Sequence, residues 1–506
     1  MLGFADTPLG VSPQWPTSRA GPGFAGLSAA LVDSPDVLCS KLEDPNVLVV
    51  TTGQQPGLFT GPLYTIHKAL SARAVAALLE ARWRRPVVPV FWLAGDDHDF
   101  AEAAEAHWFG PDGAVVSVGL EPRPADAPQR SMAQEAVPPR AVELLAELRA
   151  ALPPGPARDQ TLEWLSRHYR VGNSLARAFG ESLAEVLGPL GIACFDPTAP
   201  AAKAAAAPTV LAAIHRAADL DRRLVARAAD LEAQGQGPGV KVGDGATLGF
   251  LDGPGGRDRL VLDPAGFRTR RGGEVISAAE LDRIGREEPT RLSPNVLLRP
   301  VVESAILPTV GYVAGPGELR YLALAEVLYE PLGVRRQIPM PRWSGILVEP
   351  RVTRGLEKFG ATLAEMFEAG AAIERRVLGD LAPVDFEPAF ADARRTVDAA
   401  YERVLAVAKG IDPTLERPAT ASRSGALAGL ADLEKRLLQA QKRRHAEVLT
   451  QLERTRTAIR PGGAPQERVI GLPALTGRYG LPILAELADH IRDWYRRALE
   501  GGAPTA

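Results

Sequence analysis

Cysteine is scarce in this chain. Only Cys39 and Cys194 occur among 506 residues, and they form no Cys-x-x-Cys pair. A disulfide framework or a zinc knuckle needs more cysteines at closer spacing, so neither is expected to organise the fold. The sequence also lacks a long apolar run, and residues 1–16 lack a basic segment followed by an apolar one. We therefore expect a soluble, cytoplasmic protein without a signal peptide or membrane span.

An excess of positive charge is also missing. The chain has 58 Lys and Arg residues against 61 Asp and Glu residues, a formal net charge of −3. Nucleic acid and membranes are therefore not expected as main partners, because their recognition usually needs a basic surface. A length of 506 residues exceeds what one hydrophobic core usually serves, which predicts two or three domains.

The most informative stretch lies between Asn46 and Glu102. Residues 47–52 form a β-branched run that is typical of a strand buried on both faces of a parallel sheet. A loop with three glycines and two prolines follows at 53–62, and residues 63–81 have helical propensity. A second apolar run at 87–94 ends in the acidic turn 95–100. The pattern predicts a strand–helix–strand unit.

The two turns of this unit should lie at one edge of the sheet, because parallel strands share the edge where their carboxyl ends meet. The first turn offers backbone amides, the side chains of Gln54 and Gln55, and a helix N-terminus, which suit a phosphate or a carboxylate. The second offers three carboxylates and His98, which suit a metal, an amine or proton transfer. We predict a site that holds an acid beside an amine.

A similar arrangement recurs later in the chain. Residues 293–300 form an apolar run that includes Arg299, and the predicted strand 306–314 leads into a second Gly-rich turn at 315–318. Arg299 can clamp a carboxylate or phosphate that the turn also binds through backbone amides. The alternative is a structural ion pair of Arg299 with Glu303 or Glu318.

The remaining sequence predicts further elements. We expect helices at 27–32, 141–152, 161–187, 201–227 and 482–499, a hairpin-like excursion at 108–136, strands at 191–197, 337–341 and 346–349, and an inserted β subdomain at 235–273. Cys194 falls in one of these strands, and we expect a buried, unreactive thiol there.

Apolar residues near the C-terminus step alternately by four and three, which indicates a heptad seam. The first seam comprises Phe386, Phe390, Ala393, Val397, Ala400, Val404, Val407 and Ile411, and a second runs through Leu427, Ala431, Leu438, Val448, Leu452 and Ile459. His445 is interpreted as a polar break in the second seam. The pattern predicts an antiparallel helical hairpin whose narrow apolar stripe favours a homodimer.

These elements predict an α/β fold with a Rossmann-like parallel-sheet core, two inserted connecting subdomains and a C-terminal antiparallel α-helical coiled coil. The predicted segments are core, 1–107; a mostly helical insertion, 108–188; a core strand, 189–200; a second insertion with the small β subdomain, 201–290; core, 291–375; coiled coil, 376–460; and a core-packing segment, 461–506.

Five motifs together resemble the family of the bacillithiol biosynthesis cysteine-adding enzyme, BshC. They are TGQQPGLFTGPLYTIHK at 52–68, GDDHDF at 95–100, SPNVLLRP at 293–300, GPGE at 315–318 and PQER at 465–468. The resemblance covers nearly the whole chain in the same order. It implies a Rossmann-like core with two connecting insertions, a coiled coil that mediates dimerisation, and the addition of L-cysteine to glucosaminyl malate in the last step of bacillithiol synthesis.

The family is also similar in its core to class I aminoacyl-tRNA synthetases and to the cysteine ligase of mycothiol synthesis. Those enzymes activate cysteine as an adenylate with a His-x-Gly-His turn. Here the corresponding turn is Phe59-Thr60-Gly61-Pro62, which has neither histidine. ATP or ADP therefore stays open as a cofactor, and nothing in the sequence requires a metal.

We assign site residues on these grounds. The expected catalytic residues are Asp97, His98, Asp99 and Lys68, of which His98, Asp97 or Asp99 accepts the proton of the amine and Lys68 offsets developing negative charge. The expected substrate- or nucleotide-binding residues are Gly53, Gln54, Gln55, Phe59, Thr60, Gly61, Tyr64, His67, Asp96, Asn295, Arg299, Tyr312, Gly315, Gly317 and Glu318. For His67 the alternative is a structural contact beneath the loop, and for 96–99 a helix N-cap cluster.

Two other functions remain open from the residues alone. A metal-dependent amidohydrolase of a thiol pathway could use Asp96, Asp97, His98, Asp99 and His67. A nucleotide-binding scaffold could recruit partners through its coiled coil. The small molecules L-cysteine, glucosaminyl malate and an adenine nucleotide are the expected partners of the ligase.

Overall fold

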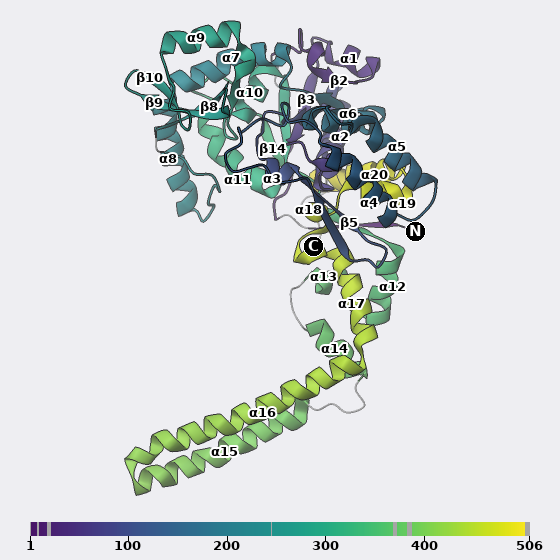
Figure 1. The fold of residues 1–506 in the computed structure, drawn as a ribbon, viewed down its shortest axis with the longest axis vertical. Helices are drawn as coiled ribbons and strands as arrows, with labels where there is room; N and C mark the ends of the chain where they lie inside the picture. Colours follow the sequence, from purple (N-terminus) through teal and green to yellow (C-terminus); the bar gives the residue numbers. More distant parts are fainter. Residues whose placement is uncertain are drawn as a thin grey trace. The chain divides into compact units, whose positions relative to one another are not determined.

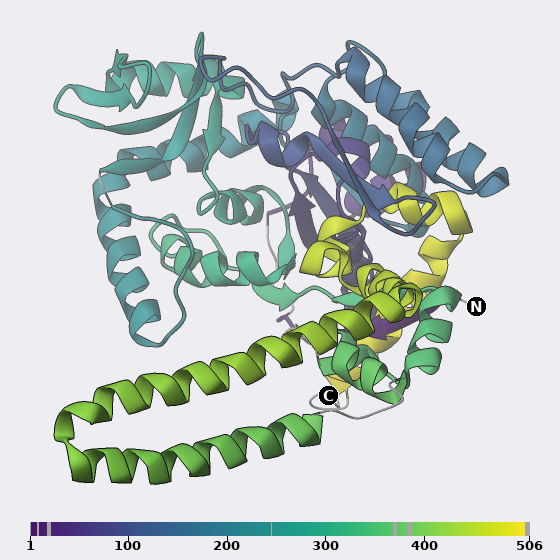
Figure 2. The same cartoon turned by 60° about the horizontal axis from the view of Figure 1, so that its bottom comes forward.

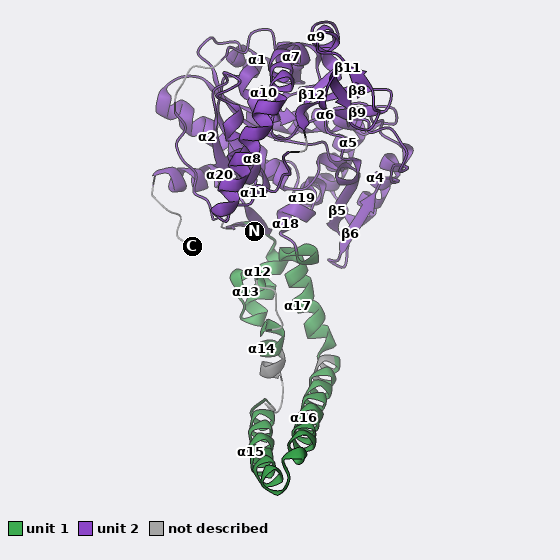
Figure 3. Ribbon diagram, turned by 90° about the vertical axis from the view of Figure 1, so that its left-hand side faces the viewer, with its two compact units in different colours: residues 1–3, 348–463 green, residues 4–347, 464–506 purple. Residues whose placement is uncertain are grey.

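The chain folds into two compact units. The structure, a computed structural model, describes residues 2–7, 10–17, 22–243, 245–367, 372–381 and 387–500 (Figure 1). One unit comprises residues 4–347 and 464–506, and the other comprises residues 1–3 and 348–463 (Figure 3). None of the described helices is both long and apolar enough to cross a lipid bilayer.

A six-stranded sheet forms the centre of the larger unit. Its order is β14 (Ile338–Pro341), β13 (Thr309–Ala314), β3 (Leu48–Gln54), β4 (Val87–Leu93), β7 (Ala193–Phe195) and β2 (Leu31–Val32). All neighbours are parallel except β2, which pairs antiparallel with β7. The central strands β3 and β4 are almost entirely buried, as their apolar sequences predict for a sheet covered on both faces. The α/β class with a Rossmann-like core is thus confirmed.

The predicted strand–helix–strand unit is present. The helix α2 (Tyr64–Trp83) joins β3 to β4 and packs against both strands and against the C-terminal helix α20 (Ile483–Glu500). The register of β3 and β4 pairs Gly53 with Trp92 and Gln54 with Leu93. The loops that follow the two strands therefore begin at the same edge of the sheet.

The chain between β4 and β7 is mostly helical. Its elements are α3 (Phe100–Ala103), the hairpin β5 (Glu105–Phe109) and β6 (Val115–Gly119), α4 (Pro139–Ala151), α5 (Pro156–His168) and α6 (Leu175–Leu187). The prediction of one helix over 161–187 was wrong, because α5 ends at His168. A new helix, α6, starts where the side chain of Ser174 accepts a hydrogen bond from the backbone N–H of Arg177 at 3.1 Å.

The second insertion carries the predicted small β subdomain. It contains α7 (Pro200–His215), α8 (Ala217–Ala233), α9 (Ala278–Glu287) and a five-stranded antiparallel sheet in the order β11 (Val275–Ile276), β10 (Gly266–Thr269), β9 (Gly256–Asp263), β8 (Ala246–Gly253), β12 (Leu292–Pro294). A single helix over 201–227 was predicted. The backbone of Arg216 is non-helical instead, and the resulting break lets α7 and α8 both pack against β8.

Other short elements complete this unit. They are α1 (Asp36–Leu42), α10 (Arg299–Ile306), α11 (Pro316–Ala325), α18 (Gln466–Val469), α19 (Leu472–Tyr479), and a two-stranded pairing of β1 (Gly3–Asp6) with β15 (Gly345–Val348). A helix was predicted at 27–32, but residues 28–30 form one 3₁₀ turn and 31–32 form β2. The apolar run at 293–300 forms a strand only as far as Pro294, because Asn295 Oδ1 accepts hydrogen bonds from the N–H groups of Leu297 and Leu298 and turns the chain into α10.

The smaller unit contains the predicted helical hairpin. Its helices are α12 (Pro350–Phe359), α13 (Leu363–Phe367), α14 (Ala372–Leu381), α15 (Glu387–Ile411), α16 (Glu416–Arg444) and α17 (Ala446–Ile459). Figure 2 shows α15 and α16 lying side by side along their length, which their contacts confirm. His445 is the break between α16 and α17, since its backbone is non-helical.

The predicted first seam is only partly packed. Phe390 is buried and Val397 is half-buried, whereas Val404, Val407 and Ile411 are exposed. Phe386, the first residue of that seam, lies outside the described residues. The hairpin thus leaves apolar side chains of α15 open to solvent.

Candidate functional site at the carboxyl edge of the sheet

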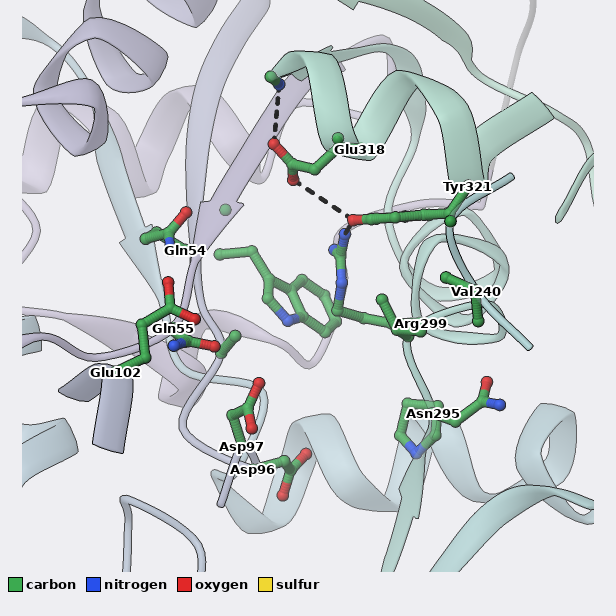
Figure 4. Close-up of a pocket in the computed structure, with 18 of the residues that line it drawn as sticks. Gln54, Gln55, Asp96, Asp97, Glu102, Val240, Asn295, Arg299, Glu318 and Tyr321 are labelled. Carbon is green, nitrogen blue, oxygen red and sulfur yellow. Dashed lines mark hydrogen bonds between the residues drawn. The ribbon is translucent and has the colours of Figure 1, made fainter. Parts of the chain in front are cut away.

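A cleft of about 560 Å³ opens where β3, β4 and β13 end. Inserted or distant parts of the chain close its other sides, among them the β subdomain, the turn before α11, residue 342 and residue 468. Figure 4 shows Gln54, Gln55 and Glu102 on one side of the cleft, Asn295, Arg299 and Tyr321 on the other, and Asp96 and Asp97 between them. The predicted meeting of the Gln-rich loop and the acidic turn is therefore present in the structure.

The amide side of the cleft is fixed by Lys68. Its Nζ donates hydrogen bonds to the carbonyl oxygen of Gly53 at 2.8 Å and to Oε1 of Gln54 at 2.9 Å, and it forms an ion pair with Glu318 at 2.5 Å. Gln54 Nε2 donates to the hydroxyl of Tyr64 at 3.2 Å. Burial lowers the pKa of Lys68, and the adjacent Glu318 carboxylate opposes this effect.

Glycine at position 53 is required by a close approach of backbone. A Cβ there would lie 2.8 Å from the carbonyl oxygen of Trp92 on the neighbouring strand. The lack of a side chain at position 53 lets β3 stay paired with β4 as far as Gln54, the last residue of the strand.

The acidic turn is largely engaged with protein groups. Asp96 forms an ion pair with the buried Lys203 at 2.6 Å. Asp97 Oδ1 accepts hydrogen bonds from the N–H groups of His98 and Asp99, and Asp99 caps α3 by accepting from the N–H of Glu102. The N-cap alternative therefore describes Asp99, which does not line the cleft, whereas Asp96, Asp97 and His98 do.

His98 is held by an arginine from the β subdomain. Nη1 of Arg257 lies 3.0 Å from Nδ1 of His98. Burial and the positive charge of Arg257 lower the pKa of His98. Because arginine only donates hydrogen bonds, Nδ1 of His98 is the acceptor and its lone pair is not available to a substrate. The predicted role of His98 as proton acceptor conflicts with this contact at Nδ1.

Glu102 was not assigned to the site from the sequence, yet it lines the cleft beside Gln55 (Figure 4). Its side chain is exposed, and its Oε1 accepts a long hydrogen bond of 3.4 Å from the hydroxyl of Tyr64. Burial, together with the nearby charge of Asp99, raises the pKa of Glu102. It forms no ion pair with any described residue, so it is a carboxylate that can bind or deprotonate an amine.

The far side of the cleft contains a buried network. Arg299 pairs with Glu303 at 3.2 Å and donates to the hydroxyl of Tyr312 at 2.7 Å, and Tyr312 donates to Glu318 at 2.8 Å. The structural ion pair offered as the alternative for Arg299 is thus present, although Arg299 also lines the cleft. Tyr312 is fully buried behind the lining residues.

The N-terminus of α11 faces the cleft. Gly315, Gly317 and Glu318 line it, and the N–H of Gly315 donates to Oε2 of Glu318 at 2.8 Å. Burial raises the pKa of Glu318, but Lys68 and this backbone donor outweigh burial and lower it overall. Asn295 also lines the cleft, while its Oδ1 caps the turn before α10.

Part of the 52–68 motif lies away from this cleft. Phe59 and Thr60 have left-handed backbones and are fully buried, and the N–H of Thr60 donates to the hydroxyl of Tyr169 at 3.0 Å. Gly61 lines a smaller neighbouring cavity of about 180 Å³, which shares Gln54, Gln55, Tyr64, Glu102 and Arg468 with the main cleft. Phe59 and Thr60 shape the loop instead of lining the cleft.

His67 has the structural role that was given as its alternative. Its side chain is fully buried, Nδ1 lies 2.9 Å from Glu467, and its ring packs edge-on against Trp343 with centroids 4.7 Å apart. The first turn of α2 is also covered, since the N–H of Leu63 donates to the carbonyl oxygen of Ile470 at 2.8 Å. The predicted anion site at the N-terminus of α2 is therefore partly occupied by protein groups.

Several cationic side chains from distant segments line the cleft but were not among the site residues assigned from the sequence. Those that line the cleft besides Lys68 and Arg299 are Arg257, Arg259, Arg320, Arg342 and Arg468. Arg468 belongs to the PQER motif, which was recognised in the sequence, although none of its residues was assigned to the site. Arg257 and Arg259 alternate on β9; they could touch a substrate, but charges on such hairpins are usually solvated, so they were not assigned to the site.

The described residues include no group of three or more His, Cys, Asp or Glu side chains placed to hold a metal ion. Neither cysteine lines the cleft. Cys194 is buried in β7, as predicted, and burial raises the pKa of its thiol to about 12.

Two family models match this chain. The model described as "Bacillithiol biosynthesis BshC, N-terminal Rossmann-like domain" matches residues 36–343, and "Bacillithiol biosynthesis BshC, C-terminal coiled-coil domain" matches residues 345–493. Together they span most of the chain and both kinds of architecture described above.

Several curated proteins are similar along most of their length. A protein of Solibacter usitatus named "Putative cysteine ligase BshC" is 32% identical over 469 residues, which are 92% of this chain and 87% of that protein. Proteins with the same name from Salinibacter ruber (32% over 454 residues, 89% and 82% of the two chains) and Desulforamulus reducens (27% over 462 residues, 90% and 85%) are also similar.

Proposed function

The chain belongs to the bacillithiol biosynthesis BshC family, and from this premise we propose that it joins L-cysteine to glucosaminyl malate in the last step of bacillithiol synthesis. The observation that carries the proposal is one cleft with an amide-bearing side, a free carboxylate and a cationic wall. An amide ligase needs such a combination, because it must hold an acid and an amine together.

The charge of the cleft suits these substrates. Seven basic side chains (Lys68, Arg257, Arg259, Arg299, Arg320, Arg342 and Arg468) line it against four acidic ones (Asp96, Asp97, Glu102 and Glu318). Several of these charges are already paired: Asp96 with Lys203, Glu318 with Lys68, Arg299 with Glu303 and Arg342 with Glu467. Arg257, Arg259, Arg320 and Arg468 then remain against Asp97 and Glu102. The remaining positive charge matches the carboxylates of cysteine and of the malyl group.

Glu102 is the proposed general base. In the reaction, the amine nitrogen of the sugar attacks the activated carboxyl carbon of cysteine, so the C–N bond forms and the bond from carbon to the activating group breaks. The amine proton passes to Glu102, whose raised pKa makes its carboxylate a better proton acceptor than an ordinary glutamate. Gln55 and Tyr64, which lie beside Glu102, would orient the amine.

ATP or ADP is the proposed nucleotide, and the turn before α11 is where its phosphates fit best. Gly317 has open space where a Cβ would lie, and Lys68, Arg320 and Arg342 line the same part of the cleft. A nucleotide bound there would supply the energy that activates the cysteine carboxyl. The chain's own contribution is to place backbone N–H groups and cations around its phosphates.

Mass analysis of the reaction tests this function. Purified protein is incubated with cysteine, glucosaminyl malate and ATP, and each component is omitted in turn. We expect a product whose mass is the sum of the two substrates less one water, and only when cysteine and glucosaminyl malate are both present. If no condition gives that product, the proposed function is wrong.

The Glu102→Gln variant tests the general base. We expect turnover to fall by about 10²- to 10⁴-fold, because the amide cannot accept the proton. Glu121→Gln is the matched control, since Glu121 is also exposed, lies in the same part of the chain between β4 and β7, and does not line the cleft. Equal turnover in both variants would remove Glu102 from this role.

We also propose that the hairpin of α15 and α16 makes the protein a homodimer. Val404, Val407 and Ile411 leave an exposed apolar stripe on α15, as a dimer surface requires. Sedimentation of the double variant Val404→Glu, Val407→Glu should give a monomer. The control Val225→Glu changes an exposed valine in the other unit and should sediment like the wild type.

A further inference from the structure

The guanidinium of Arg257 is held by three hydrogen bonds and by contact with an aromatic ring. Its Nε donates to Oγ of Ser293 at 2.8 Å, Nη2 donates to the carbonyl oxygen of Pro294 at 2.7 Å, and Nη1 donates to Nδ1 of His98 at 3.0 Å. The group also lies over the ring of Phe250, 3.8 Å from its centroid. Arg257 is therefore a rigid hydrogen-bond donor whose position follows from β9 and from the end of β12.

A donor in this position selects one form of His98. Arginine has no acceptor, so the contact exists only when Nδ1 of His98 carries a lone pair. In the neutral ring the proton then resides on Nε2. No described residue accepts a hydrogen bond from this Nε2, and His98 is one of the residues that line the cleft.

We propose that Arg257 is a positioning residue that holds His98 as a neutral imidazole with its Nε2–H directed to the substrate. His98 then acts as a hydrogen-bond donor and not as a base. The inference rests on the proposed ligase function, since it concerns the same cleft. It gives His98 and Glu102 separate tasks: Glu102 removes a proton, and His98 donates a hydrogen bond.

The reaction needs a donor of this kind. When the amine attacks the activated carboxyl carbon, the carbonyl oxygen becomes negatively charged in the tetrahedral intermediate. A preorganised N–H group stabilises that charge more than it stabilises the neutral carbonyl, which raises the rate of the step. His98 remains neutral throughout, and no proton leaves it.

The charges around His98 favour the neutral form. The groups that face it are Arg257 and Arg271 from the β subdomain and Asp97 and Asp99 from its own turn. Burial is the largest influence and Arg257 the next, and both lower the pKa of His98. A protonated ring would present an N–H to Arg257 and lose the contact. The hydrogen bond from Arg257 to His98 should therefore weaken only at acidic pH.

Nuclear magnetic resonance of protein labelled with ¹⁵N-histidine tests the tautomer directly. We expect His98, assigned by comparison with His98→Gln, to show an unprotonated Nδ1 and a protonated Nε2 in the full-length wild type at neutral pH. A protonated Nδ1 would overturn the proposal. This measurement needs no substrate, so its result is separate from whether the ligase function is correct.

The variant Arg257→Met removes the donor and keeps a long side chain over Phe250. We expect His98 to show both tautomers and a pKa nearer its ordinary value. Arg259→Met is the matched control, because Arg259 lies near the same Phe250 ring but makes no contact with His98. A change of tautomer in both variants, or in neither, would contradict the assignment.

Substitution of His98 itself distinguishes a donor from a base. We expect His98→Ala to lower turnover by about 10²- to 10³-fold, as for loss of one oxyanion donor. His98→Gln should recover a large part of this loss, because its amide can donate but is not basic. If His98→Gln is as inactive as His98→Ala while both remain folded, His98 is not acting as a donor.

Discussion

Replacing Glu467 by glutamine should destabilise the larger unit strongly. Glu467 lies in α18 and is 3% exposed. Its carboxylate accepts hydrogen bonds from both terminal nitrogens of Arg342, from Ser344 at 2.7 Å and from Nδ1 of His67 at 2.9 Å. These contacts join the C-terminal segment to α2 and to the strand region that borders the cleft.

The size of the destabilisation follows from Arg342, which would lose its carboxylate partner. Arg342 is 2% exposed and its ion pair is with Glu467, so the variant would bury a guanidinium without its counter-charge. Breaking a buried pair in this way costs about 3–5 kcal/mol. Burial raises the pKa of Glu467, but His67 and Arg342 outweigh burial and hold it well below its usual range.

The sign of the pH dependence follows from that depressed pKa. The stabilisation by ionised Glu467 is fully present above the pKa of an unfolded glutamate, about 4.3, and is lost as the pH falls below it. The difference in unfolding free energy between the wild type and Glu467→Gln should therefore be largest at neutral pH and shrink in acid.

Urea unfolding followed by tryptophan fluorescence measures this difference. The control is Glu486→Gln, an exposed carboxylate on α20, which should change the unfolding free energy by no more than about 0.5 kcal/mol. If Glu467→Gln unfolds at the same urea concentration as this control at neutral pH, the buried ion pair does not hold the segment in place.

Two further predictions concern the cleft and the cysteines. Lys68→Met should reduce turnover by at least about 10²-fold, because it leaves Glu318 without its cation and removes positive charge from the cleft; near-normal turnover in steady-state assays would contradict this. The double variant Cys39→Ser, Cys194→Ala should keep the turnover of the wild type, because neither thiol lines the cleft. A protein-bound thioester detected by intact mass in the wild type and lost in the variant would disprove that reasoning.

The sequence predicted the part of the site that is local in the chain. The runs before Gly53 and Asp96 have the composition of buried parallel strands, and the rule that such strands share one edge placed Gln55 and His98 in one cleft. That prediction needed no long-range information, because β3 and β4 are consecutive in the chain and in the sheet.

The rest of the site depends on contacts that leave no local pattern. Arg257 comes from an antiparallel hairpin, and about 160 residues separate it from His98. His67 lies in the same motif as Lys68, yet consecutive residues on a helix point in different directions. One therefore faces the cleft and the other the buried Glu467.

The structure changes the assignment of tasks within the acidic turn. Sequence motifs show which residue types are present, whereas a proton acceptor must also have a free lone pair. At His98 the lone pair of Nδ1 is taken by Arg257, and at Asp97 one oxygen is taken by two backbone N–H groups. Glu102 lies one turn further along, and its carboxylate pairs with no cation among the described residues. Its pKa is also raised. A base for the amine is therefore better sought at Glu102 than within the motif that first identified the site.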